Sequence, residues 1–218
     1  ILQALEGLRV VDMATVLAGP AAGKYLADFG ADVIKIEAPE GDGTRRMGWM
    51  PPDGGDAYMW QIVGRGKRSV VADLKTEDGL ELLLRLVDDA DVLIENFRPG
   101  TMERLGLDPT ELLKRNPRLV ILRVSGFGQT GPYANRPGYD FIIQGMGGFM
   151  SVTGEKEDLP GGGPQKAGVA IADIFTGMYA TSAILAAVVA LTQSGIHLPN
   201  ASAGWWGLGP PPWPARCR

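Results

Sequence analysis

Short apolar runs alternate along this chain with longer stretches in which apolar residues recur at helical spacing. Five runs have the length and apolar content of buried strands, and they lie at 8–13, 31–37, 67–74, 91–96 and 118–126. Strands that alternate with helices indicate βαβ units with right-handed crossovers. The pattern therefore predicts an α/β fold with a Rossmann-like, mostly parallel sheet flanked by helices.

Helices are predicted between these runs, and a longer one follows them. Thr76 is placed to cap a helix whose first turn carries Glu77 and Asp78, as the helix dipole prefers. The stretch 174–191 has no charged residue and reaches the length of a membrane span. Because it is rich in Ala, Thr, Ser and Gly and lacks basic flanks, we interpret it as a buried core helix and expect no membrane.

The stretch 196–218 differs in composition from everything before it. It holds three of the five Trp residues and a run of three prolines, with no charge before Arg216. Neither strand nor helix periodicity is visible in it. We therefore expect residues 1–195 to form one domain. We expect 196–218 to be an aberrant tail, produced by out-of-frame translation; a flexible native tail is the alternative.

The composition removes several classes of function. A net charge of −4 argues against a general nucleic-acid binder, although it allows a local basic pocket. The only histidine is His197 and the only cysteine is Cys217. Residues 1–196 therefore contain no Ser-His-Asp triad, no thiol nucleophile and no Cys/His zinc site. The chain begins at Ile1 rather than at a methionine, so we expect the numbering to begin inside a longer natural chain. No signal-peptide pattern is visible at this start, and we expect a cytoplasmic protein.

A glycine-rich motif, "GFGQTG" at 126–131, matches the dinucleotide fingerprint G-x-G-x-x-G. That fingerprint requires a helix to start directly after it, but Pro132 and Pro137 follow here. A nicotinamide site is therefore disfavoured. We expect a tight loop at a strand end, where the backbone can approach a ligand closely.

Basic residues gather near several predicted strand ends. They are Arg45, Arg46, Arg65, Lys67, Arg68, Arg98, Arg104 and Arg136. Any one of them can be an ordinary solvated surface residue. Arg98 and Arg136 come just after strands, where open α/β sheets bind ligands. Several cations converging there would suit a polyanionic ligand such as a nucleotide phosphate.

Asp173 is a carboxylate within an apolar stretch, 169–175. Burying an acid is costly, so its charge must be paired, neutralised or used. One interpretation is an N-cap for the helix that follows. The other is a nucleophile that is partly desolvated and is held ionised by the helix dipole and backbone N–H groups. The two interpretations do not exclude each other.

Several segments, in this order, resemble the family III CoA-transferases, which include formyl-CoA transferase, carnitine CoA-transferase and the bile-acid-inducible transferases. The segments are "LEGLRVVDM…AGP", "LADFGADVIKIE", "KRSVVADLK", "ADVLIENFRPG…RLG", "NPRLVILRVSGFGQTGPY", "PGYDFIIQGMGGFMSVTG" and "VAIADIFTGMYA". They cover nearly all of 5–195. The resemblance implies the large domain of such an enzyme with its C-terminal half missing, since family members are about twice as long. It also implies an interlocked homodimer in full-length relatives.

The resemblance implies a function and a site. Asp173 falls on the family's catalytic aspartate, which carries CoA between an acyl-CoA and a carboxylic acid through anhydride and aspartyl-CoA intermediates. The CoA contacts fall on Leu17, Ala18, Ala72, Asp73, Leu74, Lys75, Asn96, Phe97, Arg98, Arg104 and Arg136. Similar enzymes often have arginine where this chain has Ala38; Arg45 or Arg46 could substitute. CoA or acyl-CoA is expected as substrate, with no tightly bound cofactor and no metal.

Segment 138–154 looks most like the branch that handles succinyl-CoA and other dicarboxylates. Two alternatives remain. The first is a truncated CoA-binding fragment without catalysis, because the family's glycine-rich loop over the aspartate lies in the missing half. The second is an α-methylacyl-CoA racemase, a sister branch whose catalytic histidine would stand where this chain has Tyr139.

Overall fold

In the computed structural model, which describes residues 3–194, five parallel strands form one sheet in the order β3-β2-β1-β4-β5. The strands are β1 (Arg9–Asp12), β2 (Asp32–Glu37), β3 (Lys67–Val71), β4 (Val92–Glu95) and β5 (Val120–Arg123). Every predicted strand is present, and the α/β prediction is confirmed. The third strand ends at Val71, three residues before the predicted end. The chain leaves β1 toward β2 and β3 and later returns to place β4 on the other side of β1.

Helices connect the strands as the periodicity predicted. They are α1 (Ala18–Asp28), α2 (Tyr58–Val63), α3 (Glu77–Asp88), α4 (Thr101–Arg104), α5 (Pro109–Arg115), α6 (Asp140–Met146) and α7 (Ile171–Ser194), with 3-10 turns η1 (Gly43–Arg46) and η2 (Phe149–Val152). The Thr76 cap is confirmed, because its hydroxyl accepts a hydrogen bond from Gly79 N at 3.1 Å. After "GFGQTG" the chain forms turns rather than a helix, as the prolines predicted.

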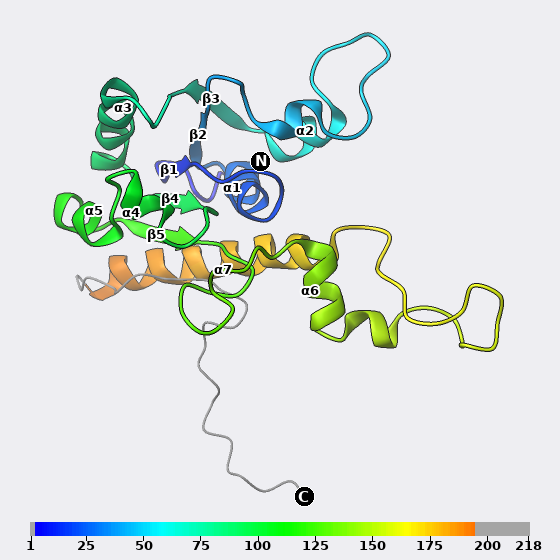
Figure 1. Ribbon diagram of the computed structural model, residues 1–218. Coiled ribbons are helices and arrows are strands. Elements are labelled where there is room, and N and C mark those ends of the chain that lie inside the picture. Colours follow the sequence, from blue (N-terminus) through cyan, green and yellow to red (C-terminus); the bar gives the residue numbers. More distant parts are fainter. Residues whose placement is uncertain (1–2, 195–218) are drawn as a thin grey trace, which may run out of the picture.

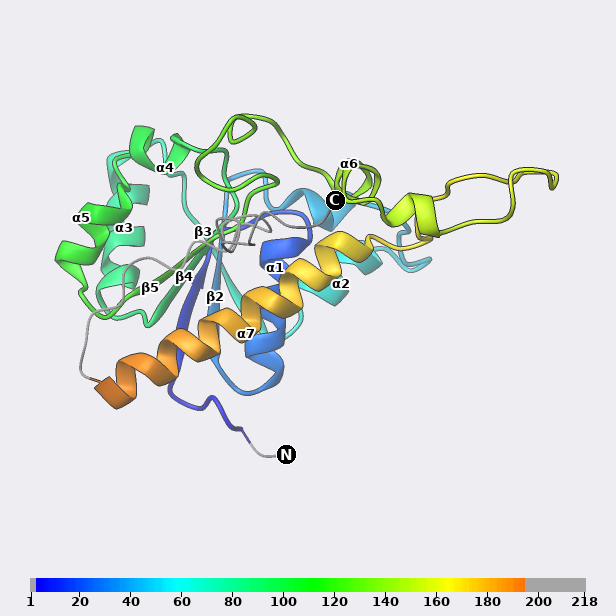
Figure 2. The ribbon, with the colours of Figure 1, turned by 90° about the horizontal axis from the view of Figure 1, so that it is seen from below.

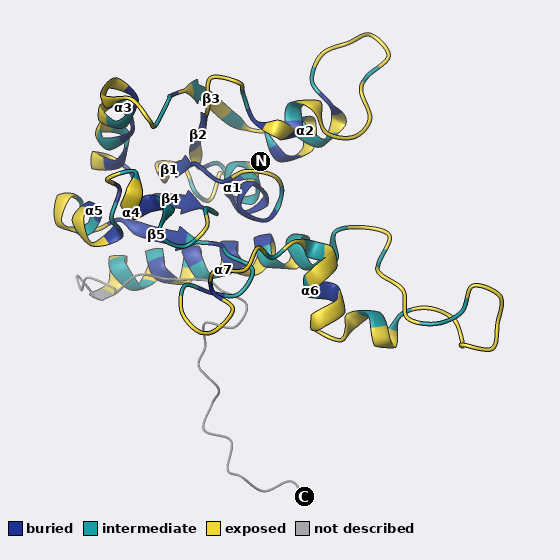
Figure 3. Ribbon diagram, in the orientation of Figure 1, coloured by how far each residue is buried: buried dark blue, intermediate teal, exposed yellow. Residues whose placement is uncertain are grey.

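The helices cover both faces of the sheet (Figure 1). Figure 2 shows α3, α4 and α5 on one face and α1 with α7 on the other. Each face has its own core. One core joins strand residues such as Val10 and Ile94 to α1 and α7, and the other joins Val11 and Leu93 to α3 and α5. Figure 3 shows β1, β2, β4 and β5 mostly buried and the edge strand β3 more exposed. The segment from α6 to α7 is largely exposed and extends away from the sheet.

Helix α7 is buried on one face only. Small residues allow this face to approach α1 closely, since a Cβ at Gly177 would lie 2.7 Å from Ala21 Cβ. Ile184 belongs to the core, but Phe175 and Tyr179 are exposed. The predicted helix is confirmed, and its predicted burial holds for one face. By length and composition alone α7 could cross a membrane, which is weak evidence because core helices of soluble proteins pass the same test.

Some predictions fall beyond what the structure describes. The proposed aberrant tail at 196–218, with His197 and Cys217, lies outside the described residues. The predicted domain boundary at 195 lies outside them as well and stays a prediction.

Candidate active site

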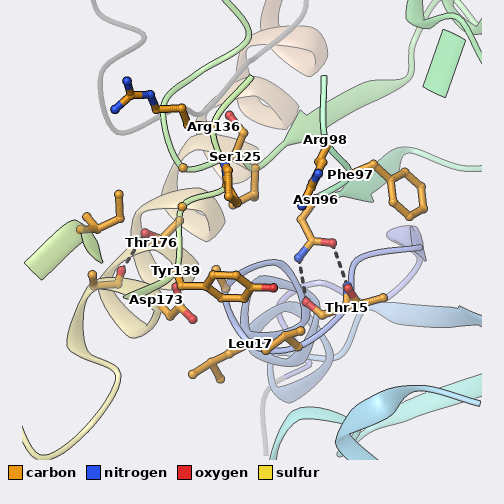
Figure 4. Close-up of a pocket in the computed structure, with 18 of the residues that line it drawn as sticks. Thr15, Leu17, Asn96, Phe97, Arg98, Ser125, Arg136, Tyr139, Asp173 and Thr176 are labelled. Carbon is orange, nitrogen blue, oxygen red and sulfur yellow. Dashed lines mark hydrogen bonds between the residues drawn. The ribbon is translucent and has the colours of Figure 1, made fainter. Parts of the chain in front are cut away.

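A cavity of about 230 Å³ opens at the carboxyl ends of β1, β4 and β5 (Figure 4). It lies where the sheet order reverses, because the chain runs from β1 toward β2 on one side and places β4 on the other. Open parallel sheets bind ligands at this switch point. Its walls include Thr15 after β1, Asn96 after β4, Ser125 after β5 and Asp173 on α7.

Asp173 is the third residue of α7 and not its cap, so the N-cap interpretation is wrong. Asp140 performs that function from another element, because its Oδ1 accepts hydrogen bonds from Ala172 N at 2.8 Å and Asp173 N at 3.2 Å. The other carboxylate oxygen, Oδ2, accepts a hydrogen bond from Gln144 Nε2. The start of α7 is thus held by an acid at the start of α6.

The side chain of Asp173 is partly buried, and this burial together with the nearby charge of Asp140 raises the pKa of Asp173 to about 6. The expectation that backbone N–H donors would hold Asp173 ionised is wrong, because the N–H groups of Ala172 and Asp173 donate to Asp140 instead. At neutral pH a carboxyl with this pKa is still mostly ionised. It is also more basic than an ordinary carboxylate, which favours nucleophilic attack.

A strained loop forms the wall opposite Asp173. Val16 has φ of 67°, a left-handed conformation that is strained for a β-branched residue. Asn96 holds the preceding residue from both sides, because its Oδ1 accepts from Thr15 N at 2.9 Å and its Nδ2 donates to Thr15 O at 2.7 Å (Figure 4). Both polar ends of Asn96 therefore fix the cavity wall. A contact between Asn96 and CoA stays a prediction.

The loop after β5 is closed by two glycines. A Cβ at Gly126 would lie 2.4 Å from Gly138 Cα, and the reverse contact is equally close. Two backbones can meet this closely only without side chains. The contact brings Ser125 and Tyr139, which flank these glycines in the sequence, to the same cavity.

Seven of the twelve site residues predicted from the sequence meet in this cavity. They are Leu17, Ala18, Asn96, Phe97, Arg98, Arg136 and Asp173. The Arg136 guanidinium lies 4.3 Å from the Tyr133 ring centroid. Phe97 also packs against the core, and Figure 4 shows its ring directed away from Asp173.

The other five predicted contacts do not line this cavity. Ala72, Asp73, Leu74 and Lys75 follow β3 at the edge of the sheet, where they form the turn into α3. In this turn Asp73 Oδ1 accepts from Lys75 N at 3.0 Å. Arg104 donates to Thr101 Oγ1 at 2.8 Å on α4. Their contacts with CoA stay predictions for a different part of an extended ligand.

Several other basic residues are occupied by internal carboxylates, which favours their structural interpretation. Arg45 pairs with Glu37 and Asp56, and its guanidinium lies 3.9 Å from the Trp60 ring centroid. Arg45 is therefore not positioned to replace the arginine missing at Ala38. The remaining pairs are Arg65 with Asp28, Lys67 with Asp12, and Arg68 with Asp32.

Sequence reasoning missed several residues of the site, including three that carry polar side chains. Ser125 and Thr176 line the cavity, and Asp140 holds the start of α7. Ser125 directly precedes "GFGQTG", so a glycine-rich loop at a strand end was the available signal. No local signal identified this function of Asp140, because its partners on α7 are 32 and 33 residues away. Among residues 3–194, no three His, Cys, Asp or Glu side chains gather as a metal site would require.

Comparison with known proteins gives a consistent result. The family model described as CoA-transferase family III matches residues 5–196. The succinate–glutarate CoA-transferase of Agrobacterium fabrum is 55% identical over 198 residues, covering 88% of this chain and 48% of that protein. The succinyl-CoA–L-malate CoA-transferase beta subunit of Chloroflexus aurantiacus is 44% identical, covering 88% of this chain and 46% of that protein.

Solved structures agree in fold. A CAIB/BAIF family protein from Brucella suis superposes with a TM-score of 0.82 at 48% identity, covering 92% of this chain and 51% of that one. Rv3272 from Mycobacterium tuberculosis superposes with a TM-score of 0.82 at 38% identity, covering 93% of this chain and 55% of that one. The chain spans about half the length of the curated relatives it matches.

Proposed function

Because the chain belongs to CoA-transferase family III, we propose that it supplies the CoA site and the nucleophile of an enzyme that moves CoA between an acyl-CoA and a carboxylic acid. One observation carries this proposal. The partly buried carboxylate of Asp173 lines the same cavity as Arg98 and Arg136, at the switch point of a parallel sheet.

The proposed reaction begins when a carboxylate oxygen of Asp173 attacks the thioester carbonyl carbon. The C–S bond breaks, so CoA leaves as a thiolate and an aspartyl–acyl anhydride remains. The thiolate then attacks the aspartyl carbonyl carbon, which releases the donor acid as a carboxylate and leaves an aspartyl-CoA thioester. The acceptor carboxylate repeats the sequence in reverse: a second anhydride forms, the thiolate takes the acceptor acyl group, and Asp173 is regenerated.

The surroundings of Asp173 suit these steps. A carboxylate is a weak nucleophile, and partial desolvation with close placement can supply part of the rate. Burial and Asp140 raise the pKa of Asp173 to about 6, which makes it more basic while it stays mostly ionised at neutral pH. A partly closed cavity also limits hydrolysis of the anhydride by water. Arg98 and Arg136 supply positive charge for the phosphates of CoA.

We propose dicarboxylic acids as donor and acceptor, with succinyl-CoA as the first donor to test. The support is the activity for which two relatives are named, a succinate–glutarate and a succinyl-CoA–L-malate CoA-transferase. A homodimer is proposed as well. Phe141, Phe149 and Val152 lie in the arm formed by residues 140–170, and they are exposed apolar residues that a partner would cover.

Trapping of the intermediate tests the proposal. The chain is incubated with succinyl-CoA, then with hydroxylamine or borohydride, and its peptides are analysed by mass spectrometry. An activated aspartyl group should give a hydroxamate or an alcohol at Asp173, and Asp173→Asn should give neither. Asp158→Asn, a change of an exposed acid in the arm, is the matched control and should label normally.

The alternatives give different results. Binding of CoA by calorimetry without any label supports a CoA-binding fragment that does not react. A label on another residue contradicts the assignment of Asp173. Exchange of the α-proton of a 2-methylacyl-CoA without transfer would support a racemase, although Tyr139 stands where the resemblance places that enzyme's histidine.

A further inference from the structure

Three buried side-chain atoms lack a hydrogen-bond partner among residues 3–194: Asp42 Oδ2, Ser125 Oγ and Gln129 Nε2. Asp42 Oδ2 has the Lys35 ammonium at 3.2 Å as an ionic partner. The other two are neutral groups without such compensation. A buried polar group left unpaired costs free energy, so each needs an explanation.

Of these two neutral groups, only Ser125 lines the cavity that holds Asp173. Its position is fixed, because the next residue, Gly126, is pressed against the backbone of Gly138. Figure 4 shows Ser125 on the wall of the loop after β5, the same loop that carries Arg136. The hydroxyl is therefore an unpaired hydrogen-bonding group on the cavity wall, where a bound molecule can satisfy it.

We propose that Ser125 Oγ forms a hydrogen bond with an amide group of the pantetheine arm of CoA, an inference that rests on the proposed function. The phosphates of CoA are expected at the guanidinium groups of Arg98 and Arg136, and the thioester at Asp173. The arm that joins these parts of the ligand is neutral and carries amides, which both donate and accept hydrogen bonds. The Ser125 hydroxyl can donate to an amide oxygen or accept from an amide N–H, and it lines the same cavity as the two guanidinium groups and Asp173, which the arm must connect.

Calorimetry with two probes tests this assignment. The probes are CoA, which has the pantetheine arm and no acyl group, and adenosine 3′,5′-bisphosphate, which has no arm. Ser125→Ala should weaken CoA binding about tenfold, the usual effect of removing one hydrogen bond to a desolvated partner. It should leave binding of the bisphosphate unchanged.

Gln129→Leu is the matched control, because it removes the other unpaired buried neutral group from the same loop outside the cavity. It should leave the affinity for CoA unchanged. Neither change removes a hydrogen bond of the free protein. The midpoint of urea unfolding without ligand should therefore not fall in either variant. If Ser125 had only a structural role, Ser125→Ala would lower this midpoint.

Each result has one meaning. If wild-type chain binds neither probe, the proposed CoA site is overturned, and the role of Ser125 falls with it. Equal CoA affinity of wild type and Ser125→Ala overturns this inference alone and indicates that water satisfies the hydroxyl. Equal weakening for both probes places Ser125 at the nucleotide end and overturns the pantetheine assignment.

Discussion

Two groups of acidic residues near the carboxyl edge of the same sheet have opposite surroundings. The first is a paired network, in which Asp12, Asp42 and Glu37 each face a cation: Lys67, Lys35 and Arg45 respectively. The second is a carboxylate pair, Asp140 and Asp173, which has no salt bridge within residues 3–194. The two groups differ in whether the fold itself supplies the compensating charge.

The paired network is neutralised internally. Burial alone would raise the pKa of Glu37, yet hydrogen bonds from Arg45, Ser69 and the backbone of Asp42 together lower it to about 2. Lys67 Nζ lies 2.7 Å from Asp12 Oδ2, and both side chains are almost inaccessible to solvent. Each of these carboxylates is engaged by a cation of the fold, so together they join the strands to the loop after β2.

The carboxylate pair lacks such compensation. Asp140 uses its oxygens to hold the start of α7 and Gln144, and Asp173 lies beside it at the cavity. A charge that the fold leaves uncompensated makes an acid more basic and more reactive, which is typical of catalytic sites. Comparison of the two groups therefore separates structural acids from the candidate nucleophile without reference to any relative.

The largest effect is expected from a substitution that breaks the paired network. Lys67→Met should lower the free energy of unfolding by about 3–5 kcal/mol, because it leaves Asp12 buried and unpaired. The neighbouring Arg68→Met is the matched control. The Arg68–Asp32 pair is largely exposed, so its loss should cost about 0.5 kcal/mol. Urea unfolding of both variants measures the difference, and equal losses would contradict the claim that burial distinguishes the two pairs.

Much of this fold could be predicted from local pattern. The strands are apolar runs, and Thr76 caps α3 through its own sequence neighbours. The ion-pair partners of the basic residues could not be predicted from local pattern. Lys67 reaches Asp12 across 55 residues, and Arg68 reaches Asp32 across 36. The sequence shows that a lysine is present, but which carboxylate neutralises it depends on the order of strands in the sheet.

In the candidate site, too, local features could be predicted and contacts between distant segments could not. The position of Asp173 near a helix start is local and was predicted correctly, whereas its neighbour Asp140 is distant in sequence and was missed. The assignment of Asp73 and Lys75 came from a resemblance, and the structure shows these two residues in a turn beyond the edge strand. Contacts that depend on a bound ligand are not encoded in the pattern of one segment.

A medium effect is expected from the carboxylate pair. The pKa of Asp173 is raised from an ordinary value of 3.8 to about 6, so the folded state binds this proton more tightly than the unfolded chain does. Its stabilising contribution is full below pH 3.8 and is lost as pH rises through about 6. Because the carboxyl is partly exposed, solvent reduces this effect. We expect the wild type to lose about 1–2 kcal/mol of unfolding free energy relative to Asp173→Asn as the pH rises.

Urea unfolding at acidic and neutral pH checks this prediction. The free energy of unfolding of Asp173→Asn should equal that of wild type at the lowest pH at which both still fold. At pH 8 the variant should be more stable than wild type. Asp158→Asn, in the exposed arm, should follow wild type throughout. A wild type that gains stability over Asp173→Asn as pH rises would show that the carboxylate is compensated after all, and the contrast between the two groups would disappear.

The smallest and sharpest effect is the influence of one carboxylate on the other. Asp140→Asn keeps an oxygen that can accept from Ala172 N and Asp173 N but removes the negative charge. The pKa of Asp173 should then fall from about 6 toward its ordinary value. Part of the elevation should remain, because burial is the larger cause and Asp140 the smaller one. Carbon-13 NMR titration of the labelled aspartate carboxyls measures this directly.

Gln144→Leu separates charge from geometry in this experiment. Gln144 donates to Asp140 Oδ2, so its loss loosens Asp140 while leaving the charge in place. If Asp140 acts through its charge, the Gln144 variant should keep the pKa of Asp173 near that of wild type, and only Asp140→Asn should lower it. If both variants lower it equally, the position of α7 rather than the adjacent charge controls the basicity of Asp173. The proposed nucleophile would then owe its reactivity to burial alone.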